Sequence, residues 1–251
     1  MENMNKLKDM ESLEKRLENI ELIMTQDITL YDYSWGGLVK KNKRIIPWLF
    51  VFDNVLTKKE CKNIIKVSNN HYISSRTSNY KGINTKNSFR TSYNTERSWT
   101  SKLKEKETKP LKILSTITSF LTGTDINNQE EVSIVRYNEG QYFKGHYDNF
   151  PIRLKNKMTD NGGNRIWTAM FYLSDVEEGG GTYFFPSQLN INPKPGRLVL
   201  WKNIIENKPN KKSFHAGLPI IEGTKHIANI WVRERIHDMY NWPNDPSTLT
   251  K

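Results

Sequence analysis

The segment HIANIWVRE, residues 226–234, predicts a β-strand, because its side chains change character with a period of two. Successive side chains of a strand point to opposite faces, so Asn229, Trp231 and Arg233 share one face with Lys225 just before the segment. The other face carries mainly Ala, Ile and Val. A lysine, an amide, an indole and a guanidinium on one face suit a cavity that holds a charged small molecule, although a solvent-exposed face would show the same pattern.

Other segments after residue 123 share this period. They are EVSIVRY (131–137), RIWTAMFYL (165–173), TYFFP (182–186) and RLVLW (197–201). Clusters of Gly, Pro and Asn, such as EEGGG and NPKPG, separate them. Many short strands with turn signals between them predict an antiparallel sandwich or barrel.

The first half of the chain predicts helices and loops. An apolar strand at Trp48–Phe52 precedes a helix that we expect to begin near Thr57, whose hydroxyl could cap it. A second helix is expected to have Pro110 in its first turn. Residues 72–99 are rich in Ser, Thr and Asn and predict loops, with a strand around Phe89–Ser92. The fold class we expect is α+β, mainly β, with helices supporting the β core.

Composition limits the kind of protein. No apolar run reaches the ~20 residues of a membrane-spanning helix, and the opening residues lack the pattern of a secretory signal, so we expect a soluble, cytoplasmic protein. Cys61 is the only cysteine, which excludes an intrachain disulfide and a cysteine-based zinc site. The net charge is +11, but the lysines are scattered along the chain rather than clustered, so we expect no nucleic-acid partner. An apolar stripe within residues 10–24 could pair with a second copy, but packing on the protein's own core is the simpler interpretation.

The stretch GHYDNF, residues 145–150, places His146 and Asp148 on one side of a strand. Such a pair is weak evidence alone, but a second histidine on a neighbouring strand would complete the two-His, one-carboxylate triad of non-haem Fe(II) oxygenases. Of the five histidines, His215 and His226 are the candidates for this third ligand. His215 follows a loop at the start of an extended segment, whereas His226 faces away from Lys225.

The order of His146, Asp148, His215 and Lys225 resembles that of the iron- and 2-oxoglutarate-dependent prolyl 4-hydroxylases. Four segments carry the similarity further: SFRTSYN (88–94), RYNEGQYFKGHYD (136–148), EEGGGTYFFP (177–186) and KPGRLVLW (194–201). The resemblance implies a double-stranded β-helix, or jelly-roll, core. It divides the chain into an N-terminal helix and connector (1–45), a catalytic domain (46–237, with a helical layer at 46–125 and the core at 126–237) and a tail (238–251).

The resemblance also implies roles for individual residues. Fe(II) would be held by His146, Asp148 and His215, with O2 as a cosubstrate and ascorbate as a reductant. 2-Oxoglutarate would chelate the iron at one end. At its other end the carboxylate would pair with Lys225 and accept hydrogen bonds from Tyr137 and Thr182.

On the substrate side, the resemblance places Glu130, Arg165 and Trp231 around a peptidyl proline, where the indole offers the ring a flat wall. A packing role for these three residues is an equally good interpretation. Two positions depart from the family: Phe143 replaces a tyrosine, and Gly145 stands where proline is frequent. The missing phenol puts peptide preference in doubt.

Other functions are open to the same residues. Lysyl hydroxylases and nucleic-acid demethylases of this superfamily generally use arginine where this chain has Lys225. A non-catalytic jelly-roll binding module should have lost at least one of His146, Asp148, His215 and Lys225, yet all four are present. We therefore expect an enzyme that converts peptidyl proline to 4-hydroxyproline while 2-oxoglutarate becomes succinate and CO2.

Overall fold

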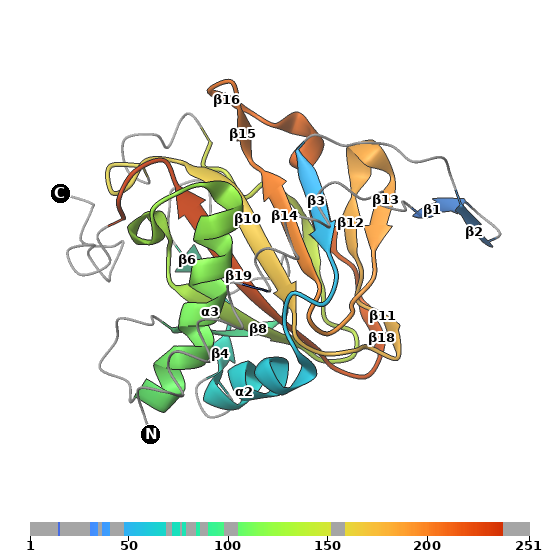
Figure 1. Ribbon diagram of the computed structural model, residues 1–251. Coiled ribbons are helices and arrows are strands. Elements are labelled where there is room, and N and C mark those ends of the chain that lie inside the picture. The colour runs from blue at the N-terminus through green and yellow to red at the C-terminus, as the bar shows by residue number, and fades with distance from the viewer. Residues whose placement is uncertain are drawn as a thin grey trace.

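Two facing β-sheets and the helices α2 (Lys58–Ser68) and α3 (Glu105–Thr122) make up most of the described part of the protein, as a computed structural model shows (Figure 1). The structure describes residues 15, 31–34, 37–40, 48–68, 72–75, 77–78, 84–85, 90–97, 105–151 and 159–237. The apolar stripe of residues 10–24, apart from Lys15, and the tail at 238–251 lie outside these residues, so their expected roles stay predictions.

The large sheet has seven strands, and every neighbouring pair is antiparallel. In spatial order they are β3 (Leu49–Phe52), β14 (Leu198–Lys202), β10 (Arg165–Tyr172), β19 (Lys225–Arg233), β8 (Val132–Tyr137), β7 (Tyr93–Arg97) and β4 (Ile73–Ser74). The five segments predicted as strands from period-two patterns are all confirmed.

The small sheet has six strands and is also antiparallel. In order they are β2 (Gly37–Lys40), β1 (Tyr31–Ser34), β13 (Leu189–Ile191), β12 (Thr182–Phe184), β17 (His215–Gly217) and β9 (Phe143–His146). Three further strand pairs occur among the described residues. Two are hairpins, β5 (Thr77–Ser78) with β6 (Asn84–Thr85) and β15 (Ile204–Ile205) with β16 (Lys208–Pro209), and the third pairs β11 (Glu178–Gly179) with β18 (Ile220–Glu222), which lie far apart in the sequence.

The large sheet separates two hydrophobic cores. On β10, Ala169 and Phe171 pack in the core that also contains residues of the helices, whereas Met170 and Tyr172 pack in the core shared with the small sheet. Alternation along a strand produces this division, since neighbouring side chains enter opposite layers. The second core lies between the two sheets, as expected for a jelly roll, and the mainly β fold class is confirmed.

Helices α2 (Lys58–Ser68) and α3 (Glu105–Thr122) lie against the outer face of the large sheet (Figure 1). Thr57 caps α2 as predicted, because its Oγ1 accepts a hydrogen bond from the Glu60 amide at 3.2 Å. The Glu60 carboxylate accepts the Thr57 amide in return at 2.7 Å, which completes a capping box.

Two predicted boundaries were wrong. Pro110 lies inside α3 rather than in its first turn, since the helix begins at Glu105. Proline at that position lacks only one amide donor, and the buried face of Leu111, Leu114 and Ile117 holds the helix on the sheet. The strand expected around Phe89–Ser92 begins later, as β7, because Arg90 forms only an isolated bridge to Phe143.

The strand predicted at Trp48–Phe52 is confirmed as β3. It and β7 both join the large sheet, on opposite sides of its centre. Among the described residues, the structure contains no helix with the length and apolar character needed to cross a membrane.

Candidate metal and 2-oxoglutarate site

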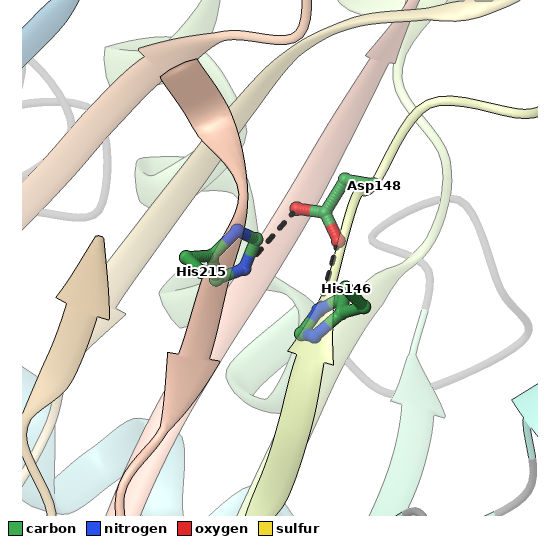
Figure 2. A group of neighbouring side chains, drawn as sticks. All are labelled: His146, Asp148 and His215. Atoms are coloured by element: carbon green, nitrogen blue, oxygen red, sulfur yellow. Dashed lines mark ion pairs between the residues drawn. The ribbon is translucent and has the colours of Figure 1, made fainter. Parts of the chain in front are cut away.

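His146, Asp148 and His215 converge from two neighbouring strands of the small sheet (Figure 2). His146 ends β9 and His215 begins β17, and the antiparallel register places these two residues opposite each other. Asp148 follows two residues after His146 and is 8% exposed. The ligand atoms of the three side chains lie within 4.8 Å of one another, so the predicted triad is assembled in space.

Both imidazoles are oriented by backbone carbonyls. The Nδ1 atom of His146 lies 2.8 Å from the Lys144 oxygen, and that of His215 lies 2.8 Å from the Ser213 oxygen. Because a carbonyl only accepts, each Nδ1 must carry the proton, which leaves the Nε2 lone pairs free. The Nε2 atoms face Asp148, at 3.3 Å from Oδ1 for His146 and 3.9 Å from Oδ2 for His215.

The surroundings keep Asp148 ionised and His215 neutral. Burial alone would raise the pKa of Asp148, but the neighbouring side chains of His146 and His215 hold that pKa well below its usual range. Burial, followed by the proximity of His146, lowers the pKa of His215 to about 4. Two neutral imidazoles and one carboxylate are the donor set that non-haem Fe(II) prefers, so these residues fit that ion.

Lys225 provides a buried positive charge in the same interior. It begins β19 opposite Tyr137 of β8 and is 2% exposed. Its Nζ donates to the Gly180 carbonyl at 2.6 Å, and no carboxylate among the described residues forms an ion pair with it. Burial lowers the pKa of Lys225 to about 7. A buried cation without an anion fits a ligand that brings its own carboxylate, as 2-oxoglutarate does.

The hydroxyls predicted to assist Lys225 lie in two different settings. The ring of Tyr137 packs 5.2 Å from the Lys225 Nζ. The hydroxyl of Thr182 lies 2.7 Å from the hydroxyl of Tyr172, which in turn donates to the Ile191 carbonyl at 2.8 Å. Since Tyr172 has only one proton, Thr182 is the donor between these two hydroxyls. Thr182 must therefore turn its proton away from Tyr172 to donate it to a ligand carboxylate.

Tyr172 is a residue that the sequence interpretation missed. Its ring lies 5.4 Å from the Lys225 Nζ, and it is fully buried. A signal was present in the sequence, because Tyr172 shares an inward face of β10 with Thr168 and Met170. Burial raises the pKa of the Tyr172 hydroxyl, so it remains a proton donor.

Glu130, Arg165 and Trp231 form one cluster beside the triad. The Arg165 guanidinium binds both oxygens of Glu130, at 2.7 and 2.6 Å, and stacks 3.9 Å from the Trp231 ring centre. Arg233 donates to the same carboxylate at 2.8 Å. Burial would raise the pKa of Glu130, but Arg165 and then Arg233 lower it to about 2. Thr168, which donates to Asp148 at 2.7 Å, pairs with Trp231 across the two neighbouring strands, so this cluster lies close to the triad.

Phe143 occupies the position where the family generally has tyrosine. Its ring stacks on His146 with centroids 3.7 Å apart, and the Arg90 guanidinium carbon lies 4.9 Å from the centre of the Phe143 ring. Arg90 is buried and donates through Nε to Ser92 at 3.0 Å. This aromatic contact holds the imidazole without any phenol.

His226, the alternative third ligand, lies on the other side of the large sheet. Its ring is 6.4 Å from that of Tyr72, and burial lowers its pKa to about 4. The register of β19 explains the separation, since His226 and Lys225 point to opposite faces. His226 therefore cannot join His146 and Asp148.

Comparison with known proteins defines the class. Residues 132–233 match the family model of the 2OG-Fe(II) oxygenase superfamily, a range that contains the triad and Lys225. Prolyl 4-hydroxylase 10 of Arabidopsis thaliana is 31% identical over 77% of this chain and 73% of its own length. The chain therefore belongs to the prolyl 4-hydroxylase family of the Fe(II)- and 2-oxoglutarate-dependent oxygenases.

Two viral proteins are also similar. A protein of Acanthamoeba polyphaga mimivirus, named as a prolyl 4-hydroxylase, is 28% identical over 86% of each chain. The crystal structure of a viral collagen prolyl hydroxylase from Paramecium Bursaria Chlorella virus-1, in complex with 2-oxoglutarate, aligns with a TM-score of 0.56 and 27% identity. That alignment covers 74% of this chain and 96% of the viral one, which agrees with a jelly-roll core.

Proposed function

We propose that the protein is a dioxygenase that hydroxylates peptidyl proline to 4-hydroxyproline. The observation that carries this proposal is that the triad of His146, Asp148 and His215 lies in the same interior as Lys225. Lys225 is a buried cation that forms no ion pair with a carboxylate of the described residues. The overall reaction balances: 2-oxoglutarate, O2 and the proline C–H bond become succinate, CO2 and the C–OH bond. Family membership adds ascorbate as the reductant that keeps the metal ferrous.

We assign the metal to His146, Asp148 and His215, through the two Nε2 atoms and the carboxylate. When bound, iron with 2-oxoglutarate and O2 supplies the oxidant that replaces hydrogen on the proline ring. The protein's own contribution is orientation, because the Lys144 and Ser213 carbonyls hold both imidazoles in the tautomer that a metal requires.

We assign the far carboxylate of 2-oxoglutarate to Lys225. The aromatic rings of Tyr137 and Tyr172 exclude water around the Nζ, which strengthens a charge-assisted bond to an anion. Thr182 is placed to donate its hydroxyl once it turns from Tyr172.

We assign Glu130, Arg165 and Trp231 to the proline side of the site. Their cluster lies close to Asp148 through Thr168, and the bidentate pair with Glu130 holds the Arg165 guanidinium over the indole of Trp231. If this assignment is correct, Trp231→Leu raises the peptide KM while 2-oxoglutarate turnover without peptide is unchanged. A loss of stability with an unchanged peptide KM would support the packing role instead.

The substrate class is tested by mixing purified protein with Fe(II), 2-oxoglutarate and ascorbate, with and without proline-rich peptides. We expect peptide-dependent succinate formation and a mass increase of one oxygen atom on proline. A matched set with lysine peptides separates the lysyl alternative, and turnover with those peptides alone would overturn the proposal.

The ligand assignment is tested with a pair of histidine variants. His215→Ala should abolish iron-dependent turnover, whereas His226→Ala should retain it, because His226 lies on the helix side of the large sheet. The reverse result would show that the assignment is wrong.

We also propose that the enzyme acts in a soluble, reducing compartment such as the cytoplasm. The lone cysteine, Cys61, supports this, because it is buried in the helix-side core as a free thiol. Cell fractionation followed by detection of the chain tests the location.

A further inference from the structure

A chain of buried hydrogen bonds leads from Asp148 into the large sheet. Thr168 of β10 donates its hydroxyl to Asp148 Oδ2 at 2.7 Å, and the side-chain amide of Asn203 donates to the Thr168 oxygen at 2.8 Å. Thr168 is 1% exposed and Asn203 is 0% exposed. We call these three residues the Asp148 relay. It joins the proposed metal ligand Asp148 to Thr168 and Asn203, neither of which has been given a role so far.

The direction of the relay follows from its chemistry. A carboxylate only accepts hydrogen bonds, so Thr168 must use its single proton on Asp148. The Thr168 oxygen can then only accept, and the amide of Asn203 is the donor that meets it. The bond from Asn203 to Thr168 therefore supports the bond from Thr168 to Asp148, and Oδ2 of Asp148 is held toward Thr168.

Asn203 itself is fixed by its backbone. The backbone amide of Asn203 donates to the backbone carbonyl of Ile166 on β10 at 2.8 Å. The backbone carbonyl of Asn203 accepts the backbone amide of Asn210 at 2.8 Å. Asn210 then accepts the Ser213 amide at 3.0 Å, and the Ser213 carbonyl is the one that orients His215. One residue is thus tied both to the carboxylate and to the turn that carries the second imidazole.

We propose that Thr168 and Asn203 are positioning residues that make Asp148 bind the metal through Oδ1 alone. Oδ1 faces the His146 Nε2 at 3.3 Å, whereas Oδ2, which lies farther from the His215 Nε2 at 3.9 Å, already accepts the Thr168 hydroxyl at 2.7 Å. Without the relay, the carboxylate is free to rotate or to offer both oxygens. The inference rests on the proposed iron site and adds the device that sets its geometry.

The test uses Co(II) as a spectroscopic probe, because its visible absorption reports the number and arrangement of its ligands. Thr168→Val removes the hydroxyl and keeps the shape, and it should weaken Co(II) binding about 10–100-fold and change the spectrum. Thr168→Ser keeps the hydroxyl and should retain the wild-type spectrum. Thr118→Val makes the same change at a fully buried position on α3, where the hydroxyl only bonds Leu114, and should leave the Co(II) spectrum and affinity unchanged.

A double-mutant cycle tests whether the two residues act in series. The Asn203 Oδ1 has no hydrogen-bond partner, so Asn203→Ala unpairs only the Thr168 oxygen within the relay. Asn203→Ala alone should weaken Co(II) binding, yet it should add little once Thr168 is already Val. Additive losses would overturn the relay.

The outcomes also separate this inference from the proposed function. If the wild-type protein binds Co(II) and Thr168→Val binds it equally well with the same spectrum, the positioning role alone is overturned. If His215→Ala instead gives the same Co(II) spectrum as the wild type, the metal site on which the inference depends is overturned.

Discussion

Lys225 couples ligand binding to proton uptake, because its buried side chain needs an anion to hold its charge. Burial lowers its pKa from 10.5 to about 7 in the ligand-free protein, so above pH 7 the amine is mostly neutral. Binding of a carboxylate restores the charge and raises the pKa again. We therefore expect the 2-oxoglutarate Kd to be nearly constant below pH 7 and to rise up to about tenfold per pH unit above it.

Calorimetry in buffers of different ionisation enthalpy measures this coupling directly. At pH 8.5 wild-type protein should take up close to one proton per 2-oxoglutarate. Lys225→Arg keeps its charge at every accessible pH and should take up none. A pH-independent Kd without proton uptake in the wild type would contradict the expected coupling.

The same lysine destabilises the ligand-free fold. Its folded pKa lies below the unfolded one, so the unfolded chain binds more protons between pH 7 and 10.5, and stability rises with pH through that window. Lys225→Met should therefore raise the free energy of unfolding at pH 7 and below, by about 1–3 kcal/mol. Thermal denaturation checks this, and the variant should also lose the stabilisation that 2-oxoglutarate gives the wild type.

Gly145 departs from the family's frequent proline, and packing explains why this chain needs a small residue there. A Cβ at this position would come within 2.7 Å of Cζ of Phe214, the residue just before His215. Gly145→Ala should force the ring aside, lower stability by about 1–3 kcal/mol and weaken metal binding.

The neighbouring strand offers a matched control for that substitution. A Cβ at Gly217 of β17 would meet only Phe143, at an ordinary 3.6 Å. Gly217→Ala should therefore keep wild-type metal affinity and nearly wild-type stability, both measured by metal titration and urea denaturation. Equal losses in the two variants would contradict the role of Phe214.

At the scale of elements, the strands of the core were predictable because each alternates between two apolar layers. The triad was predictable because His146 and Asp148 lie two residues apart in one segment, although the strand ends at His146 and Asp148 follows it. The Asp148 relay was not, since Asp148, Thr168 and Asn203 come from three segments and meet only through tertiary hydrogen bonds. The start of α3 was also missed, because packing of its apolar face outweighs the missing amide of Pro110.

The capping box of α2 contributes stability away from the site. Thr57→Ala removes the acceptor of the Glu60 amide and should lower the free energy of unfolding by about 0.5–2 kcal/mol in urea titrations. Thr116→Ala removes a hydroxyl that only bonds the Lys112 carbonyl within α3, and should be close to neutral. Both variants should bind 2-oxoglutarate like the wild type, and a weaker affinity in Thr57→Ala would mean that α2 shapes the interior.

At the scale of the whole molecule, the large sheet separates the helix-side core, which stabilises the fold, from the core between the sheets, where we place the metal and 2-oxoglutarate. The helix-side core carries no residue of the triad and not Lys225, whereas the core between the sheets surrounds them. Because neighbouring residues of β19 enter different layers, a mutation's effect on function should depend on its parity along the strand rather than on its distance in sequence.

Two apolar truncations test this division. Leu114 of α3 packs in the helix-side core, and Leu114→Ala should lower stability by about 2–5 kcal/mol while the folded protein keeps its 2-oxoglutarate Kd. Ile227 of β19 packs on the inner side, two residues from Lys225, so Ile227→Ala should lower stability similarly and also weaken 2-oxoglutarate binding. Calorimetric titration under conditions where both variants are folded separates the two effects. If Leu114→Ala weakened binding as much as Ile227→Ala, the sheet would transmit changes between the layers, and the interior could not be treated as a rigid site independent of its helices.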